Sequence, residues 1–204
     1  MSNLFFALQE QLEPALRAGD LAQCERAVAA SLATLPPSPF HVALDLAIAN
    51  PPVAVAAHCD RFFRREEARY RVGAAYAEMN GFDINPDRWF FDLFAYEYYG
   101  GTAYHEWLPE WRSEPYDDLT IRGLEPLQAV YAHADLTDRA FEDAAYVAGL
   151  LVVVKFQKLI QRAAPSMREL HCPLLATAHE YQFIFETTAD QSPRSTSGQL
   201  PGRA

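Results

Sequence analysis

Residues 89–99, WFFDLFAYEYY, are the stretch on which the expected fold class depends. Alternate positions form two apolar faces: Trp89, Phe91, Leu93 and Ala95 on one, and Phe90, Phe94, Tyr96 and Tyr98 on the other. A strand that is apolar on both faces is typical of a central strand covered on both sides. The alternative is a helix capped by residues 85–87, Asn-Pro-Asp, but the aromatic content favours a strand.

Two further segments have the two-residue period of a strand. Residues 70–79 alternate and are followed by the turn dipeptide Asn80-Gly81, which predicts a hairpin with the strand at 89–99. Residues 178–187 also alternate, with Tyr181, Phe183 and Phe185 expected to face inward. That pattern indicates an antiparallel strand with one exposed face.

Helical periodicity dominates the remaining folded sequence. Residues 1–69 predict four helices, separated by Gly19-Asp20, by the prolines of residues 36–39 and by Asn50-Pro51-Pro52. A short strand is expected at 119–121, a helix at 124–133 and a long helix at about 138–164, whose centre is apolar on every side. The predicted fold class is therefore α+β: a helical N-terminal part packed on a small, mainly antiparallel sheet, with a long buried C-terminal helix.

The chain of 204 residues is long enough to bury its own core. We expect one domain at 1–187, with a helical part at 1–69 and a sheet-containing part at 70–187. Residues 188–204 contain one leucine and no aromatic residue, so they are expected to form a disordered tail.

Charge and composition limit the classes of partner. The formal net charge of −10 disfavours general nucleic-acid binding, which requires positive charge. No signal peptide is expected at the N-terminus, and no uncharged apolar run approaches the roughly 20 residues of a membrane-spanning helix. The three widely spaced cysteines favour a reducing compartment, so a cytoplasmic location is expected. The preference for arginine over lysine, together with abundant alanine, suggests a bacterial genome rich in GC.

No sequence motif identifies a catalysed reaction. Residues 105–109, HEWLP, begin like the zinc-protease motif H-E-x-x-H but have proline in place of the second histidine. The pairs His58-Cys59 and His171-Cys172 lack the spacing of structural zinc sites, so buried thiols are the favoured interpretation. No catalytic residue, metal ligand or cofactor is assigned.

A carboxylate cluster is the basis of an enzymatic alternative. Its members are Glu78, Asp92, Glu97 and His179, which could act as acid, base or metal ligands. Asp92 lies between two phenylalanines of the predicted strand, where burial would raise its pKa. Pairing of Asp92 with an arginine from a neighbouring helix is the favoured alternative. The arginines of residues 61–71 are interpreted in the same way, as a helix with internal salt bridges rather than a phosphate-binding face.

The strongest anomaly is the irregular segment 99–118, which we call the acidic-aromatic loop. It carries five carboxylates and one arginine, a formal −4, and contains two of the three tryptophans. Rings supply buried contact area and acids steer a basic partner, so the loop is the predicted site for a basic partner protein. The candidate residues are Tyr104, Trp107, Glu110, Trp111, Glu114, Tyr116, Asp117 and Asp118.

The leading hypothesis is a non-enzymatic acidic binding protein, within which a bacterial immunity or antitoxin-like inhibitor fits the size and charge. An equal alternative for the loop is that Trp107 and Trp111 pin a lid to the core. The rival functions are the carboxylate enzyme and a helical adaptor that uses residues 1–69. A homodimer is a further alternative, because a sister subunit could cover the second apolar face of the strand at 89–99.

Overall fold

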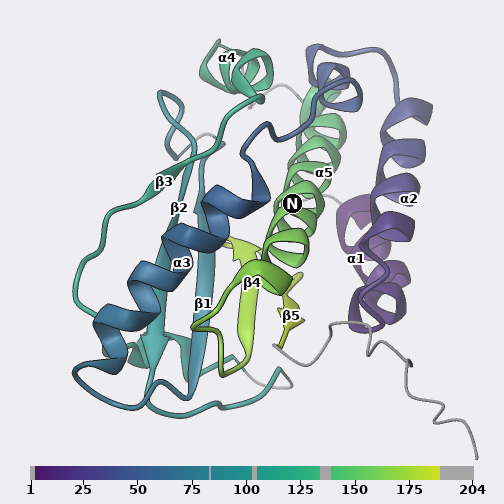
Figure 1. Ribbon diagram of the computed structural model, residues 1–204. Coiled ribbons are helices and arrows are strands. Elements are labelled where there is room, and N and C mark those ends of the chain that lie inside the picture. The colour runs from purple at the N-terminus through teal and green to yellow at the C-terminus, as the bar shows by residue number, and fades with distance from the viewer. Residues whose placement is uncertain (1–2, 83, 103–104, 134–138, 189–204) are drawn as a thin grey trace, which may run out of the picture.

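The structure is a computed structural model, which describes residues 3–82, 84–102, 105–133 and 139–188. In this part of the chain, helices pack against one face of a five-stranded sheet (Figure 1). The expected α+β class is confirmed.

Helices and strands alternate only in part along the chain. The α-helices are α1 (Asn3–Arg17), α2 (Leu21–Thr34), α3 (Pro52–Glu67), α4 (Glu125–His133) and α5 (Arg139–Ala163). The 3₁₀-helices are η1 (Pro39–Leu44), η2 (Leu108–Glu110) and η3 (Ala164–Ser166). The strands are β1 (Ala74–Asn80), β2 (Phe90–Tyr96), β3 (Leu119–Thr120), β4 (Leu174–Ala178) and β5 (Phe185–Thr187).

The strand order is β3-β2-β1-β4-β5. The β1–β2, β2–β3 and β4–β5 pairs are antiparallel, so the sheet is mainly antiparallel as expected. The β1–β4 pair is parallel, which makes β1 the central strand. Strand β2 lies between β3 and β1, as expected for an inner strand at residues 89–99, but β3 pairs with it only at Phe90 and Phe91.

The C-terminal part of the sheet also differs from the expectation. Residues 178–187 are not one strand: the chain leaves β4 at Ala178, turns through Glu180, which has a φ of 66°, and returns as β5. Strand β4 was not predicted. All five of its residues are buried, so it has no polar alternation to reveal it.

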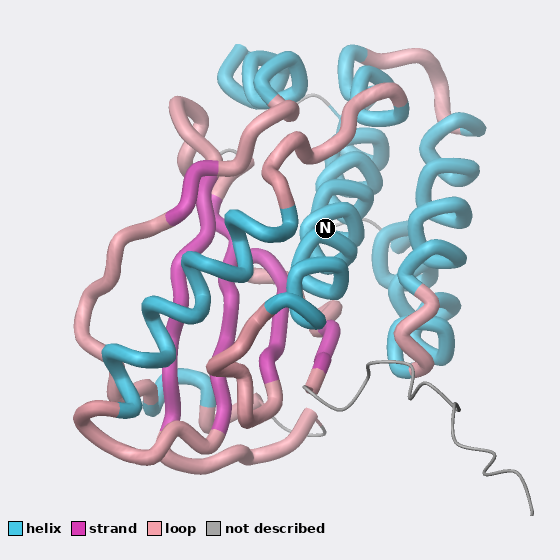
Figure 2. The backbone as a smooth tube through the Cα atoms, in the orientation of Figure 1, coloured by secondary structure: helices cyan, strands magenta, loops and turns pink. Residues whose placement is uncertain are grey.

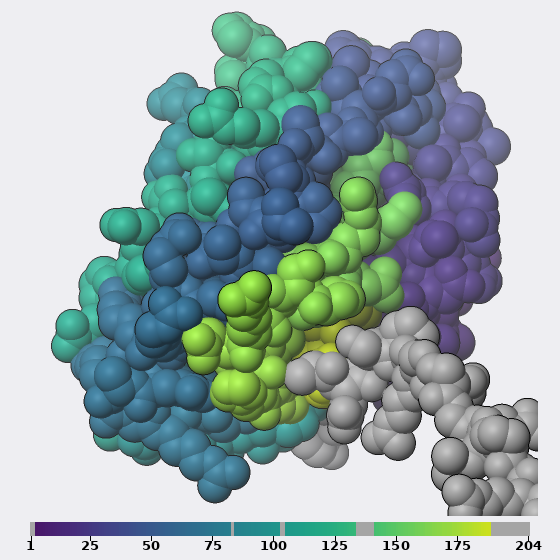
Figure 3. Space-filling model, in the orientation of Figure 1, coloured from purple at the N-terminus to yellow at the C-terminus, as the bar shows by residue number. Residues whose placement is uncertain are grey.

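The main core lies between the sheet and the helices. Helices α3 and α5 cross one face of the sheet, and α1 and α2 pack against the far side of α5 (Figure 2). In α5 the run from Leu150 to Val154 is fully buried or nearly so, which confirms the long buried helix. Seen from this side, the surface is formed mainly by side chains of α3, of the segment after α5 and of the N-terminal helices (Figure 3).

Local signals explain where several elements begin. Asp20 accepts a hydrogen bond from the backbone N–H of Gln23 and caps α2. Only glycine fits at position 73, just before β1, because a Cβ there would lie 2.4 Å from the carbonyl oxygen of Glu97. Helix α1 continues through Pro14 to Arg17, and the helix expected at 40–49 is the shorter η1. None of the helices in the described ranges is long and apolar enough to span a bilayer.

Candidate functional site

The second face of the sheet, opposite the helices, carries the candidate site. A small apolar cluster on this face includes Tyr76, Tyr96 and Leu175. Trp107 of the acidic-aromatic loop covers it: the indole is 5% exposed, lies 4.7 Å from the Tyr96 ring and donates a hydrogen bond to the Gly101 carbonyl at 2.9 Å. Trp107 therefore pins the loop to the sheet, as the lid alternative anticipates for this residue.

Trp111 has a different environment. Its side chain is 49% exposed, and its ring lies 5.2 Å from that of Phe94, which projects from β2 onto the same face. A cavity of about 320 Å³ opens beside it. We call this cavity the Trp111 groove; it is lined by residues 92–94 of β2 and by residues 111 and 113–116 of the loop.

The groove forms where the loop separates from the edge of β2. At one end β3 pairs with Phe91, and at the other the backbone N–H of Arg112 donates to the Ala95 carbonyl at 2.8 Å. The hydroxyl of Ser113 accepts from the Ala95 N–H at 3.1 Å. Between these attachments, Leu93 lines the open edge.

Arg65 of α3 and Arg69, two residues after the end of this helix, hold the loop in this position. The Arg65 guanidinium donates to the carbonyls of Glu114 and Pro115 at 2.8 and 2.9 Å and lies 4.7 Å from the centre of the Tyr116 ring. Arg65 and Arg69 both bind the fully buried carboxylate of Glu66. Arg65 and Arg69 therefore act across 45 or more residues of sequence, in addition to their local pairing with Glu66.

The negative charge of the loop is partly neutralised. Asp118 accepts two hydrogen bonds from Arg88 at 2.6 Å, and Glu114 accepts one from Arg69 at 2.8 Å. Glu110 accepts from the hydroxyl of Tyr98 at 3.0 Å, which leaves its charge uncompensated. Asp117 is exposed, and no ion pair of this residue is found among the described side chains.

Six of the eight predicted partner-binding residues fall into two groups, and Asp118 is half-buried in its pair with Arg88. Glu110, Trp111, Glu114 and Asp117 are exposed on or beside the groove. Trp107 and Tyr116 are inward, since the Tyr116 ring packs against those of His58 and Phe62. Tyr104 lies outside the described residues.

Three of the four residues in the enzymatic alternative meet on the same sheet face. Glu78 and Asp92 are cross-strand partners, and the Glu78 carboxylate lies 2.8 Å from Nδ1 of His179. The amide of Asn80 donates to Asp92 at 2.8 Å. Glu97 is separate from them, since it pairs with Arg112 at 3.6 Å at the other end of β2.

Asp92 titrates unusually. Burial is the main cause that raises its pKa from 3.8 to about 6, and the neighbouring charges of Asp118 and Glu78 raise it further against the opposing effect of Arg88. The expectation that burial raises this pKa is confirmed. Among the described residues, Asp92 does not pair with a helical arginine as expected, and its carboxylate accepts a hydrogen bond from Asn80 on the neighbouring strand.

Comparison with known proteins gives no family for this chain. No protein-family model, curated protein or solved structure matches it. Its function is therefore inferred from the chemistry of its own side chains.

The three cysteine side chains are buried, as the sequence indicated. Cys24, Cys59 and Cys172 are all buried, and burial raises their thiol pKa values to about 11, 12 and 12. Within the described residues, no three His, Cys, Asp or Glu side chains form a group that could hold a metal ion.

The sequence interpretation missed the residues that shape the groove. Phe94 was assigned only to the strand, and Arg65 only to its own helix. Charge spacing along α3 did predict ion pairs, but it could not show that Arg65 reaches carbonyls about 50 residues away.

Proposed function

We propose that this protein binds a basic partner protein at the Trp111 groove and the exposed acids beside it. The observation that carries the proposal is the Trp111 side chain, which is half exposed above a groove whose floor contains Asp92. Tryptophan is enriched among residues that dominate binding energy, because its large ring buries much area when a partner covers it.

Charge determines the class of partner. Glu110 and Asp117 are exposed next to the groove without a cationic partner among the described side chains, while Asp92 lines it. A partner with lysine or arginine at its contact surface would be attracted by these carboxylates and repelled by none of the groove residues.

Within this class we propose an inhibitor of the immunity or antitoxin kind. The formal net charge of −10 supports such a role, since acidic inhibitors attract cationic toxins over long distances. The product of the neighbouring gene is the first partner to test.

The experiment uses affinity capture followed by measurement with purified components. The protein is immobilised, bound proteins from the source cells are identified, and the captured protein is purified for calorimetry. Two matched variants are compared: Trp111→Ala/Glu110→Gln at the groove, and Phe6→Ala/Glu10→Gln on α1. Both remove one exposed aromatic ring and one exposed carboxylate.

We expect a basic captured protein whose affinity falls about 30-fold or more in the groove variant, a loss typical of a binding hot spot. The α1 variant should bind like the wild type. Equal affinity of all three proteins, equal loss in both variants, or an acidic captured protein would contradict the proposal.

A second candidate function is supported by the Glu78, Asp92 and His179 cluster. A carboxyl group with a pKa of about 6 can exchange protons near neutral pH, as general acid–base catalysis requires. Carboxyl ¹³C NMR titration tests this candidate: an Asp92 pKa in the ordinary range would remove it. The helical adaptor has less support, because the apolar stripes of α1, α2 and α3 belong to the main core.

A further inference from the structure

Both lysines of this chain lie on one side of α5, together with Arg162. Lys155, Lys158 and Arg162 line a pocket of about 140 Å³. Glu25 of α2 and residues 47–48, in the chain between η1 and α3, complete it. Figure 1 shows α2 and α5 side by side here, on the helical side of the molecule.

The Lys155 ammonium group is fixed by two hydrogen bonds, which leave one of its N–H groups available. Its side chain is buried, and Nζ donates to the carbonyls of Ala43 and Leu46. An ammonium group has three donor hydrogens, so these two acceptors leave one for a further acceptor. Burial lowers the pKa of Lys155, as expected for an ammonium group whose partners are neutral carbonyls.

The positive charge of the pocket is incompletely compensated. Lys158 pairs with Glu25, and Asp45 adds a second carboxylate that acts on Lys155. Three cations against these two anions leave a formal +1 in a chain whose net charge is −10. No ion pair of Arg162 is found within the described part of the chain.

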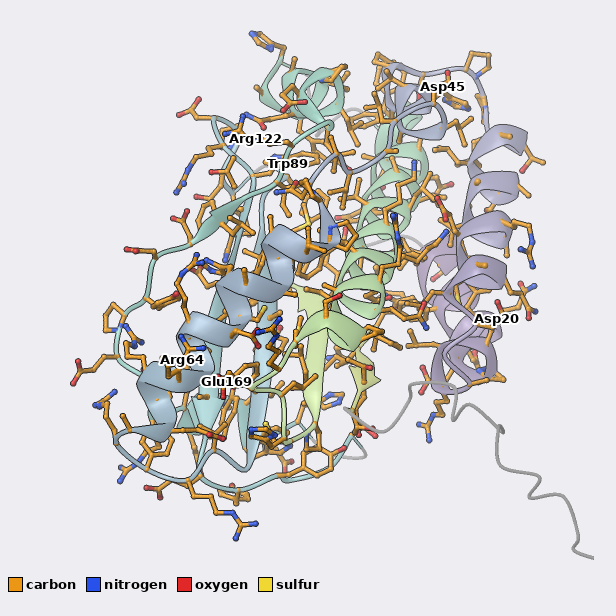
Figure 4. The ribbon with its side chains drawn as sticks, viewed as in Figure 1. Asp20, Asp45, Arg64, Trp89, Arg122 and Glu169 are labelled. Atoms are coloured by element: carbon orange, nitrogen blue, oxygen red, sulfur yellow. The ribbon has the colours of Figure 1, made fainter. Side chains whose placement is uncertain are left out.

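The arginines in and just after α3 provide a contrast. Arg64 points toward Glu169 (Figure 4). The two side chains are 2.9 Å apart, while Arg65 and Arg69 share Glu66. Those cations have carboxylate partners that account for their positions. Carbonyl capping accounts for Lys155 and the pair with Glu25 accounts for Lys158, but no carboxylate among the described residues accounts for Arg162 beside the same open pocket.

We propose that this pocket binds a small oxyanion, specifically a phosphate group, either free or carried by a small molecule that extends into solvent. Lysine ammonium groups bind phosphate as point charges, and the planar guanidinium of Arg162 can donate two parallel hydrogen bonds. A cavity of about 140 Å³ accepts a group of this size. The site is independent of the Trp111 groove.

Inorganic phosphate is the probe for a ¹H–¹⁵N NMR titration of the full chain at constant ionic strength and pH. Acetate is titrated in parallel to separate phosphate from carboxylate chemistry. Two variants each remove one exposed arginine: Arg162→Met at the pocket and Arg71→Met, which follows α3. Neither arginine has an ion pair among the described residues, so both variants are expected to fold.

We expect saturable shifts at residues 47–48 and 158–162, with phosphate stronger than acetate. Affinity should fall about fivefold in Arg162→Met, as for the loss of one exposed charge contact, and stay unchanged in Arg71→Met. Phosphate should also slow acylation of Lys158 by an amine reagent, which mass spectrometry reads without interference from other lysines. Shifts that do not saturate, shifts at other sites, or equal losses in both variants would overturn the proposal; stronger binding of acetate would overturn its assignment to phosphate.

Discussion

Replacing Asp92 with asparagine should stabilise the protein at neutral pH and leave it unchanged in acid. Burial and the charges of Asp118 and Glu78 raise the Asp92 pKa to about 6, so the folded state holds this proton more tightly than the unfolded chain. The stabilisation from the protonated carboxyl is complete below pH 3.8 and is lost as the pH rises through about 6. Asparagine resembles the protonated form and retains an oxygen to accept from Asn80.

The magnitude follows from the two pKa values. A shift from 3.8 to about 6 corresponds to about 3 kcal/mol at about 1.4 kcal/mol per pKa unit. Because Asp92 is only partly buried, solvent screening reduces the expected gain to about 1–2 kcal/mol. The variant should gain this much over the wild type at pH 7.5, and nothing at pH 3.5.

Urea unfolding from pH 3.5 to pH 8 measures this difference at each pH. Asp117→Asn is the matched control, since it removes the same charge from an exposed position of the acidic-aromatic loop. Its free energy of unfolding should differ from that of the wild type by a small amount at every pH. A pH-independent difference for Asp92→Asn, or a loss of stability at pH 7.5, would refute the assignment of a raised pKa to this carboxyl.

Three further predictions concern packing and the loop. Gly149→Ala places a Cβ 2.2 Å from the Tyr181 hydroxyl, so the free energy of unfolding measured in urea should fall by about 1–3 kcal/mol. Adding Tyr181→Phe to the same chain removes that hydroxyl and should restore part of the loss. Arg65→Met leaves the buried Glu66 carboxylate with one arginine, so it should lower the free energy of unfolding by about 2 kcal/mol and speed proteolysis within the loop. Arg112→Met, which removes one member of an exposed ion pair, should lower it by less than about 1 kcal/mol. A thiol reagent should label folded protein slowly and unfolded protein at once, because burial raises the pKa of all three thiols, Cys24, Cys59 and Cys172.

Residue periodicity predicted most of the helices and strand β2, whereas the polar alternation at 178–187 spans the end of β4, a turn and β5 rather than one strand. The alternation in residues 89–99 correctly assigned the two faces of β2, and Asp20 correctly marked the start of α2. Strand β4 was not predicted, because Leu174–Ala178 is buried on both faces and shows no polar alternation. Its parallel pairing with β1 also joins segments about 100 residues apart. No local pattern encodes such a partner.

The sequence could predict which residues belong to the candidate site, but it could not predict how they are arranged in space. Acids and tryptophans in residues 99–118 drew attention to the loop that lines the Trp111 groove, yet two tryptophans four residues apart have different environments. Trp107 is buried against Tyr96, and Trp111 is half exposed over the groove. Their difference arises from attachments to β2 and α3, which lie far away in sequence.

The parallel pairing of β1 with β4 has a consequence for the order of folding. Residues 74–80 and 174–178 must meet across roughly 100 intervening residues, which costs about 4 kcal/mol of chain entropy. On the ribosome, the β1–β2 hairpin is synthesised long before β4 emerges. Its inner edge therefore stays open until residues 174–178 have emerged, and a nascent chain that stalls before residue 174 exposes an unpaired strand to its neighbours.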